Sequence, residues 1–388
     1  MTGTGLTAKR TDHVAPRPLR TSGASARLAR RLGLRLVTTD DLTIARRLNG
    51  RGFAYAHADG RSIRDRALIA RLGKLAVPPA YADALYCPDP RGHLQAIWRD
   101  AAGRLQYRYH PDWDEVRAQR RLRRLARLTQ ALPHIRRAVA RCLAAAEPSL
   151  ELALAAIVEL VAISGIRAGR ESYVRSNGTR GAATLLKSNV AIDGDRIVLS
   201  FRAKGGKPIR KALRSRRLAA AMRTLRRLPG RRMFQCCNGN GEVRSVRARE
   251  VNAFLRDLAG VAISLKDFRT LTASAAALDT LARTEPARSA TRRKRQVRAA
   301  MQTVADQLGN TPAICRTSSV PAGLVAAFER GGLRRKTGGR QVSRKTLLAK
   351  LLARPAARPR RRPDLKTQLE RSVRRLARGS RRRGQRTA

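Results

Sequence analysis

Five segments in series carry the residue types that could act on a phosphodiester, namely arginine, lysine, tyrosine and amide side chains. They are GRLQYRYHPDW (103–113), SGIRAGRESYVRSNGTRGAATLLKSNV (164–190), FRAKGGK (201–207), LKDFRT (265–270) and QLGNTPAICRTSSV (307–320). Attack on a phosphodiester builds negative charge on its nonbridging oxygens, and planar guanidinium groups lower the barrier by stabilising that charge. About one residue in five is Lys or Arg (84 of 388). A single arginine is therefore weak evidence for a site, and the interpretation depends on the order and spacing of the motifs.

The charge of the whole chain indicates its partner. The sequence has 84 Lys+Arg against 27 Asp+Glu, a net charge of +57, and such a chain repels itself unless a polyanion compensates. Nucleic acid is the expected partner. An anionic membrane surface is the alternative, but the chain has no run of about 18 apolar residues and its basic residues are spread throughout. Aromatic residues make up only 4%, which favours duplex DNA held through its phosphates over single strands stacked on aromatic rings.

Cysteine usage predicts a reduced cytoplasmic protein without a metal site. The five cysteines are odd in number and form no C-x-x-C pair, and two of them are neighbours. The Arg-rich start of the chain could also be an organelle transit peptide, but the remainder is equally basic. We therefore expect a cytoplasmic protein associated with the nucleoid.

The hydrophobic pattern predicts an α+β protein with four parts. Residues 1–32 read as a flexible basic arm, and residues 33–114 read as a small β-rich N-terminal domain that binds DNA. From residue 115 the period becomes helical, which predicts a larger, mostly α domain over 115–333. Inside it, NVAIDGDRIVLSFRAKGGKPIRKAL predicts a three-stranded β element and RRMFQCCNGNGEVRSV a hairpin. Residues 334–388 read as a basic, disordered tail.

Taken together, the five segments resemble the type IB DNA topoisomerases of the poxvirus and bacterial kind, from about 33 to 333. The family pattern is an I-R-x-G helix, a hairpin lysine, a K-D-x-R-T helix and an L-G-x-T-P segment nine residues ahead of a nucleophilic tyrosine. The first four occur here in order. The resemblance implies a monomer that nicks one strand of duplex DNA through a 3′-phosphotyrosyl link, allows rotation and reseals, without ATP, metal or another cofactor.

The resemblance also assigns the residues of the reaction. Arg167 and Arg269 match the guanidinium pair, and Asn310 stands where the family has His or Asn and can donate to the same phosphate oxygen. Lys204 matches the general acid that protonates the departing 5′ oxygen, and Lys207 is a phosphate contact. The alternatives are a helix N-cap for Asn310 and a basic hairpin tip on the DNA backbone for either lysine.

Further residues match DNA-facing positions of the family. Gln106, Tyr107 and Tyr109 lie in a Q-Y-x-Y strand whose side chains reach the major groove. Because side chains alternate along a strand, the two tyrosines are expected on one face of the sheet. The alternative to a DNA contact is that this face is buried in the core of the domain. Arg170 and Tyr173 follow on the helix expected to carry the first guanidinium, with Arg170 one turn further along the same face.

The nucleophile departs from the family pattern. Nine positions after Asn310 stands Ser319, and all of the tyrosines lie in the N-terminal half: Tyr55, Tyr81, Tyr86, Tyr107, Tyr109 and Tyr173. Serine is shorter by a whole aromatic ring, and its alkoxide leaves less readily than a phenoxide whose pKa is about 10. The family's S-Y-V-H-P reads SSVPAG here, and its T-W-x-G-T reads TLTAS.

Three functions fit these observations. The first is a type IB topoisomerase, and the second is a catalytically silent clamp on duplex DNA that retains the arginines and the basic tails. The third is a tyrosine recombinase, which shares the Arg, Lys, Arg and Tyr chemistry. The QYRYHPDW strand favours topoisomerase over recombinase, and the absent tyrosine weakens both equally.

Overall fold

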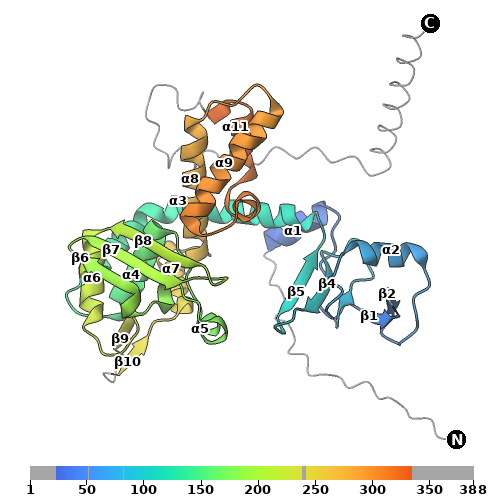
Figure 1. Cartoon of the computed structure of the whole chain (residues 1–388), viewed down its shortest axis with the longest axis horizontal. Helices are drawn as coiled ribbons and strands as arrows, with labels where there is room; N and C mark the ends of the chain where they lie inside the picture. The colour runs from blue at the N-terminus through green and yellow to red at the C-terminus, as the bar shows by residue number, and fades with distance from the viewer. Residues whose placement is uncertain (1–22, 51, 82, 238–241, 334–388) are drawn as a thin grey trace, which may run out of the picture. The chain divides into compact units, whose positions relative to one another are not determined.

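The computed structural model describes residues 23–50, 52–81, 83–237 and 242–333, which form two compact units divided between Arg123 and Arg124 (Figure 1). The helix α3 (Trp113–Cys142) contributes residues to both units. The division falls later than the predicted boundary at 114, because the start of α3 packs into the first unit through Trp113 and Val116. Most of the predicted basic arm and the whole predicted tail lie outside the described residues.

The first unit is built on one antiparallel sheet with strand order β2–β1–β3–β4–β5. Its strands are β1 (Ile44–Asn49), β2 (Gly52–Ala56), β3 (Leu85–Tyr86), β4 (Leu94–Arg99) and β5 (Leu105–Tyr109), and α2 (Arg66–Lys74) follows β2. Ile44, Leu72, Tyr86 and Trp98 are buried together between this helix and the sheet. The predicted β-rich region is confirmed.

One helix lies within the range 1–32 that the sequence pattern predicts as a flexible arm. It is α1 (Gly23–Arg31), whose Leu28 and Ala29 are buried in a small cluster with Trp113. The prediction is wrong for this segment because GASARLARR, at nine residues, is too short to show a sustained hydrophobic period. Its helix is stabilised by contacts with residues far along the chain.

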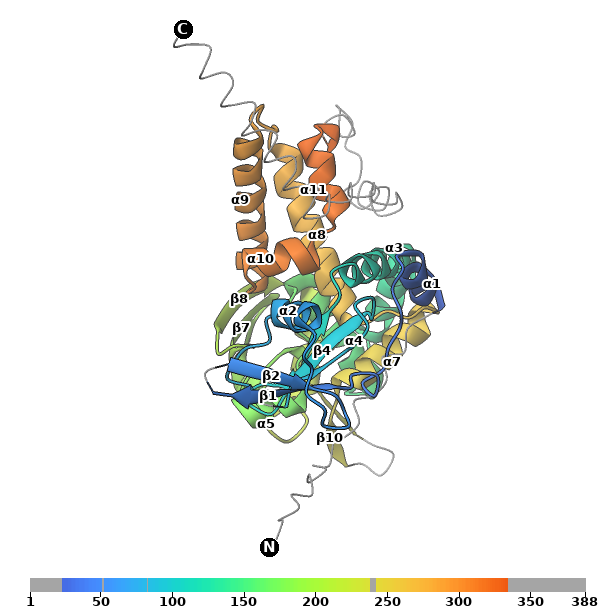
Figure 2. The ribbon, with the colours of Figure 1, turned by 90° about the vertical axis from the view of Figure 1, so that its right-hand side faces the viewer.

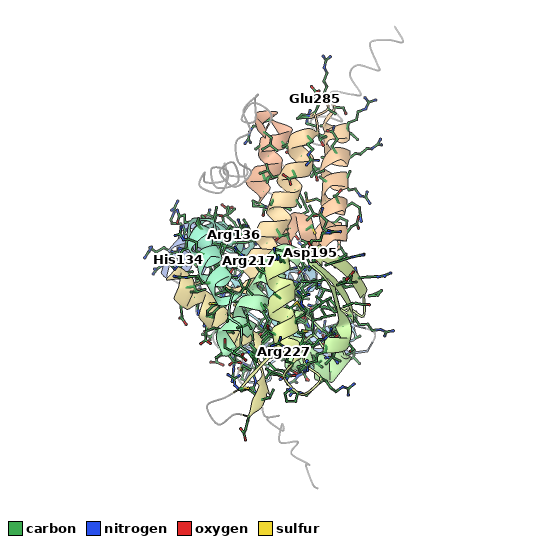
Figure 3. The ribbon with its side chains drawn as sticks, turned by 90° about the vertical axis from the view of Figure 1, so that its left-hand side faces the viewer. His134, Arg136, Asp195, Arg217, Arg227 and Glu285 are labelled. Atoms are coloured by element: carbon green, nitrogen blue, oxygen red, sulfur yellow. The ribbon has the colours of Figure 1, made fainter. Side chains whose placement is uncertain are left out.

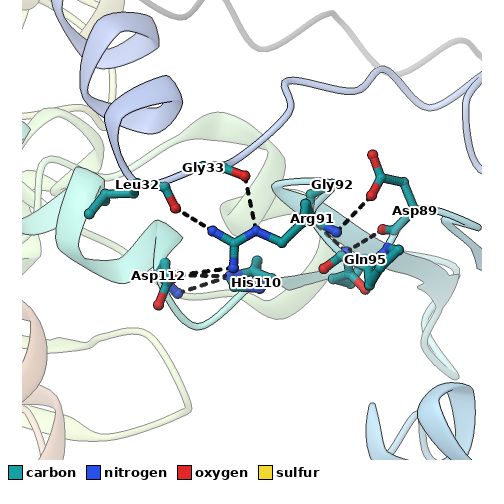
Figure 4. A network of polar contacts seen from close by, with 9 residues as sticks. Leu32, Gly33, Asp89, Arg91, Gly92, Gln95, His110 and Asp112 are labelled. Atoms are coloured by element: carbon teal, nitrogen blue, oxygen red, sulfur yellow. Dashed lines mark hydrogen bonds and ion pairs between the residues drawn. The ribbon is translucent and has the colours of Figure 1, made fainter. Parts of the chain in front are cut away.

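A single arginine fastens the end of α1 to the sheet (Figure 4). The Arg91 guanidinium donates to the backbone carbonyls of Leu32 and Gly33 and forms an ion pair with Asp112 at 3.4 Å. The Leu32 and Gly33 carbonyls follow a helix C-terminus, where free acceptors and the helix dipole favour a cation.

The second unit surrounds one apolar helix, α4 (Leu150–Ser164). LELALAAIVELVAIS is apolar on nearly every face, as expected of a helix that is covered on all sides. The Ser149 side chain caps its first turn by accepting from the Leu152 N–H at 3.1 Å, and Gly165 ends it in the left-handed conformation at φ 65°. Around it lie part of α3, α6 (Arg216–Arg226), α7 (Ala248–Ala259) and α8 (Leu265–Arg283).

Two β elements complete this unit as predicted. β6 (Val190–Asp193), β7 (Arg196–Arg202) and β8 (Pro208–Arg214) form a three-stranded antiparallel sheet, and β9 (Gln235–Cys237) pairs with β10 (Val243–Ser245). Short helices α5 (Glu171–Asn177), Ala182–Thr184 and Lys187–Asn189 connect α4 to β6. The α+β fold class is confirmed.

The C-terminal part of the second unit contains two paired helices of 19 residues each. α8 and α9 (Ala290–Leu308) run side by side, and α10 (Pro312–Ile314), a π-helical turn at Cys315–Ser319 and α11 (Ala322–Glu329) follow (Figure 2). Asp267 fixes the start of α8, since its carboxylate accepts from the Ser264 backbone and hydroxyl and forms an ion pair with Arg124 at 2.6 Å. Within the described ranges, no helix is both long and apolar enough to cross a membrane.

One carboxylate of α4 is held away from water. Glu159 is half-buried near Arg136 of α3 and Arg217 of α6, two arginines that lie close together in Figure 3. Burial raises the pKa of Glu159, and the two guanidinium groups oppose this shift only in part. The charged form of this side chain is therefore less favourable in the fold than in the unfolded chain.

We expect Glu159→Gln to increase the free energy of unfolding at neutral pH. A carboxyl with a raised pKa in the fold binds its proton more tightly there, so native stability falls as pH rises above the ordinary glutamate value of 4.5. The gain from the amide should therefore shrink toward pH 4.5. Denaturant unfolding at several pH values measures this, with the exposed Glu147→Gln as control. A variant less stable than native at neutral pH would instead show that the arginines outweigh burial.

Candidate active site

Arg167 lies in a loop rather than on a helix. α4 ends at Ser164 and α5 begins only at Glu171, with Arg170 as its N-cap residue and Tyr173 inside it. The prediction that one helix carries all three residues, with Arg167 and Arg170 on the same face, is wrong, because Gly165 ends α4 in the left-handed conformation. Arg170 and Tyr173 are both exposed at the surface of α5 and its start.

The Arg167 loop is held by a second backbone segment. The Arg167 and Ala168 carbonyls accept from the N–H groups of Ala182 and Ala183, each at 2.8 Å. The two segments touch at glycine, because a Cβ placed on Gly181 would lie 2.4 Å from the Arg167 carbonyl oxygen. The position of this arginine is thus determined by close packing of two main chains.

Three of the predicted residues meet at one point. The Arg167 guanidinium donates to Asn310 Oδ1 at 2.7 Å, and the Arg269 guanidinium donates to the same oxygen at 2.9 Å. They come from three places in the sequence: the loop after α4, the first turns of α8, and the position after Gly309, which ends α9.

Arg269 also joins two helix ends. Its guanidinium donates to the carbonyls of Gly165, after α4, and Leu308, the last residue of α9. Burial, together with the neighbouring Arg167 guanidinium, lowers the pKa of Arg269 to about 10, and burial lowers the pKa of Arg167. Within the described part of the chain, neither guanidinium forms an ion pair. Two close cations without a carboxylate are suited to binding an anion.

Asn310 is not a helix cap. The capping residue of α10 is Thr311, whose hydroxyl accepts from the Ile314 N–H at 3.3 Å. The amide oxygen of Asn310 accepts from both guanidiniums, and its side chain is also hydrogen-bonded to the Cys315 thiol. Cys315 is fully buried, and burial raises the pKa of its thiol despite this hydrogen bond and the two nearby guanidiniums.

Ser319 ends the π-helical turn that Cys315 begins. Its backbone carbonyl accepts from the Ser274 hydroxyl at 3.2 Å, and Ser274 is a fully buried residue of α8. The turn is therefore fixed to the helix that carries Arg269. In the described part of the molecule, the Ser319 hydroxyl makes no hydrogen bond with either guanidinium of the site.

Lys204 and Lys207 stand at the turn between β7 and β8. Both are exposed, and the turn is closed by the hydrogen bond from the Ala203 N–H to the Lys207 carbonyl at 2.8 Å. Gly205 and Gly206 both have positive φ, at 80° and 72°. The described contacts do not join either lysine to the arginine site, so the roles predicted for them stay predictions.

A different lysine of the same hairpin reaches the site. Lys211 on β8 donates to the carbonyls of Ser164 at 2.6 Å and Gln307 at 2.5 Å. Sequence reasoning missed it, although a signal was present: in PIRKALR it occupies a core-facing position between Ile209 and Leu213. A lysine at an inward position of an alternating strand needs specific oxygen partners.

In the first unit, the predicted tyrosines share a face. Tyr107 and Tyr109 stack with ring centroids 6.0 Å apart, Tyr107 is 40% exposed, and Tyr109 packs on Trp113. Gln106 lies on the other face of β5, where its amide donates to Asp100 at 2.9 Å. Tyr107 is the most accessible of these three side chains.

Across the ranges that the structure describes, His, Cys, Asp and Glu side chains form no group of three or more that could hold a metal ion. The side chains that meet at the candidate site are the two guanidiniums of Arg167 and Arg269 and the amide of Asn310.

The sequence matches known proteins over both units. Residues 112–325 match the family described as "Eukaryotic DNA topoisomerase I, catalytic core", and residues 52–100 match "Bacterial DNA topoisomerase IB, N-terminal domain". A similar protein is "DNA topoisomerase 1B" of Acanthamoeba polyphaga mimivirus, 28% identical over 284 residues that cover 71% of this chain and 84% of that protein.

The fold and these matches first define the class: a DNA topoisomerase catalytic core preceded by a bacterial-type N-terminal domain. More narrowly, the chain belongs to the type IB DNA topoisomerase family.

We expect Gly181→Ala to destabilise the second unit by about 1–3 kcal/mol, the usual cost of forcing a methyl group into a packed site. The added Cβ would lie 2.4 Å from the Arg167 carbonyl oxygen and 2.5 Å from the Gly169 nitrogen, and neither backbone can move freely. Urea unfolding measures the effect. Gly323→Ala in α11 is the matched control, because a Cβ there meets no atom within 4 Å. Equal stabilities for the two variants would contradict the close packing.

Proposed function

We propose that this protein binds duplex DNA around one backbone phosphate, held by Arg167 and Arg269, and that it does so without forming a covalent link to the strand. The observation that carries the proposal is the convergence of both guanidiniums on Asn310 Oδ1, at 2.7 and 2.9 Å. Their like charges oppose each other in a half-buried place. A bound phosphate would supply the opposite charge that the described residues do not.

The number of guanidinium N–H groups left over at the site supports a phosphate ligand. A guanidinium has five N–H donors. Arg167 uses one on Asn310, and Arg269 uses three on Gly165, Leu308 and Asn310. The remaining donors can bind two oxygens of one phosphate, and Asn310 retains an amide N–H beyond its bond with Cys315.

The missing tyrosine is the reason to propose binding without cleavage. Ser319 stands at the nucleophile position, and its hydroxyl is a ring length closer to the main chain than a tyrosine hydroxyl. The histidine of the family segment is also absent. Within this proposal, Lys204 and Lys207 at the hairpin tip contact neighbouring phosphates, and Gln106, Tyr107, Tyr109, Arg170 and Tyr173 contact the duplex. The protein acts as a monomer and needs no cofactor.

A second candidate is strand nicking with Ser319 as the nucleophile. It is favoured by one observation: the turn that ends at Ser319 starts at Cys315, beside both guanidiniums, and is fastened to α8 through Ser274. In this reaction the Ser319 oxygen would bond to the phosphorus and lose its proton to water, while the bond from phosphorus to the 5′ oxygen breaks and that oxygen leaves with a proton from Lys204.

We expect the native chain to leave supercoiled plasmid unrelaxed in EDTA and to form no covalent complex with DNA. Relaxation gels and denaturing capture of a labelled duplex measure this, with Arg167→Ala as the reference for a weakened phosphate site. Relaxation by the native chain would overturn the silent-clamp function in favour of the Ser319 reaction.

The Ser319→Tyr variant tests whether the missing nucleophile alone accounts for a loss of relaxation activity. If this variant relaxes plasmid while the native chain does not, only the nucleophile is missing. If both bind DNA and neither relaxes it, the loss extends further, to the region around Leu271. Leu271 stands in the segment where the family has tryptophan, and it lines a cavity of about 780 Å³ beside α8.

We expect duplex affinity to fall steeply with salt, and the logarithmic salt slope of Arg167→Ala to be smaller than native by about 1, as for the loss of one phosphate contact. Binding isotherms of a short duplex at several salt concentrations measure the slope. The control is Arg214→Ala on β8, a surface arginine paired with Asp195 at 3.8 Å. A native chain that does not bind duplex DNA at moderate salt would refute the proposed function.

A further inference from the structure

Lys211 is a half-buried cation of the second unit that no part of the expected reaction uses. Its ammonium group donates to the carbonyl of Ser164, the last residue of α4, at 2.6 Å. It also donates to the carbonyl of Gln307, in the last turn of α9, at 2.5 Å. Burial, followed by the Arg269 guanidinium, lowers the pKa of Lys211, as expected for an ammonium that has left water for two carbonyl oxygens.

Lys211 and Arg269 join the same two helix ends at adjacent residues. Lys211 binds the carbonyls of Ser164 and Gln307, and Arg269 binds those of the next residues, Gly165 and Leu308. The last carbonyls of a helix lack partners within the helix, and its dipole places negative charge there. Two cations from different elements thus hold the ends of α4 and α9 together.

Side chains packed against two glycines leave little room for these ends to shift. A Cβ on Gly165 would lie 2.7 Å from the Leu308 side chain, and one on Gly309 would lie 3.0 Å from the Ile209 side chain. Ile209 and Lys211 are alternate residues on the same face of β8. The strand that carries Lys211 is therefore packed directly against the end of α9.

Both carbonyls that bind Lys211 lie three positions ahead of a residue of the phosphate site. Ser164 precedes Arg167, and Gln307 precedes Asn310. These two downstream side chains are hydrogen-bonded to each other at 2.7 Å. Any sliding of one helix end past the other would separate Arg167 from Asn310.

We propose that Lys211 is a positioning residue that fixes the Arg167 loop against Asn310 and thereby orients the guanidinium of Arg167 toward the DNA phosphate. The inference rests on the proposed phosphate-binding function and adds a residue to it. Lys211 itself does not contact DNA in this proposal. Its effect on binding passes through Arg167.

A double-mutant cycle tests the coupling. Duplex affinity and its salt slope are measured for the native chain, Lys211→Met, Arg167→Ala and the double variant. Both basic ends of the chain are present in all four, so their contributions cancel. Arg167→Ala should weaken binding about tenfold in the native background, the usual effect of removing a hydrogen bond between charged groups. In the Lys211→Met background the same change should cost much less.

Two further variants separate positioning from general stability. Lys211→Arg can donate to both carbonyls, so it should restore the native salt slope and the full effect of Arg167→Ala. Arg214→Met, on the same strand but paired with Asp195, should leave the effect of Arg167→Ala unchanged. Thermal unfolding checks that each variant is folded. If Lys211→Met does not fold, Lys211→Gln, which can donate to one of the carbonyls, takes its place in the cycle.

The outcomes distinguish the inference from the function on which it rests. If Arg167→Ala weakens binding by the same factor with and without Lys211, Lys211 does not position Arg167 and this inference alone is overturned. If Arg167→Ala binds duplex DNA with native affinity and salt slope, the phosphate site and the inference both fail. A reduced effect of Arg167→Ala that Lys211→Arg restores supports the positioning role.

Discussion

The second unit depends on one half-buried cation, the Arg269 guanidinium. It joins α8 to the ends of α4 and α9 through three oxygen acceptors, and it lies beside Arg167. Burial and this neighbour lower its pKa to about 10, yet the group remains charged at neutral pH. The negative ends of two helices stabilise that charge. The site is therefore preorganised by helix packing before any ligand binds.

The residues proposed to bind a phosphate and the position of the family's nucleophile belong to different segments of the second unit. The residues of the proposed phosphate site are held by the helix ends and by the Arg167 loop, whereas Ser319 ends the short turn that follows α10. The turn is connected to the arginine site through the hydrogen bond between Cys315 and Asn310, whereas the described contacts include no hydrogen bond from the Ser319 hydroxyl to either guanidinium. Replacing the side chain at position 319 alone is therefore compatible with an intact arrangement of Arg167, Arg269 and Asn310. Lys211 binds the ends of α4 and α9, which support the arginine site.

The family pattern in the sequence identified Arg167, Arg269 and Asn310 correctly as neighbours, and alternation identified the strands of both β elements. Local reasoning failed where contacts with distant residues decide the backbone. Arg167 was expected on a helix, but Gly165 ends α4 and Gly181 approaches from another segment. The helix α1 was missed because its stability comes from packing on Trp113.

By itself, the sequence determined the charge of the chain, the order of the motifs and the lack of a tyrosine in the C-terminal half. These are properties of composition and order, which folding does not change. The tertiary structure alone decided that Asn310 accepts from both guanidiniums and that Lys211 fastens the same helix ends as Arg269. The physical reason is that hydrogen bonds form over about 3 Å, between residues that the chain separates by scores of positions.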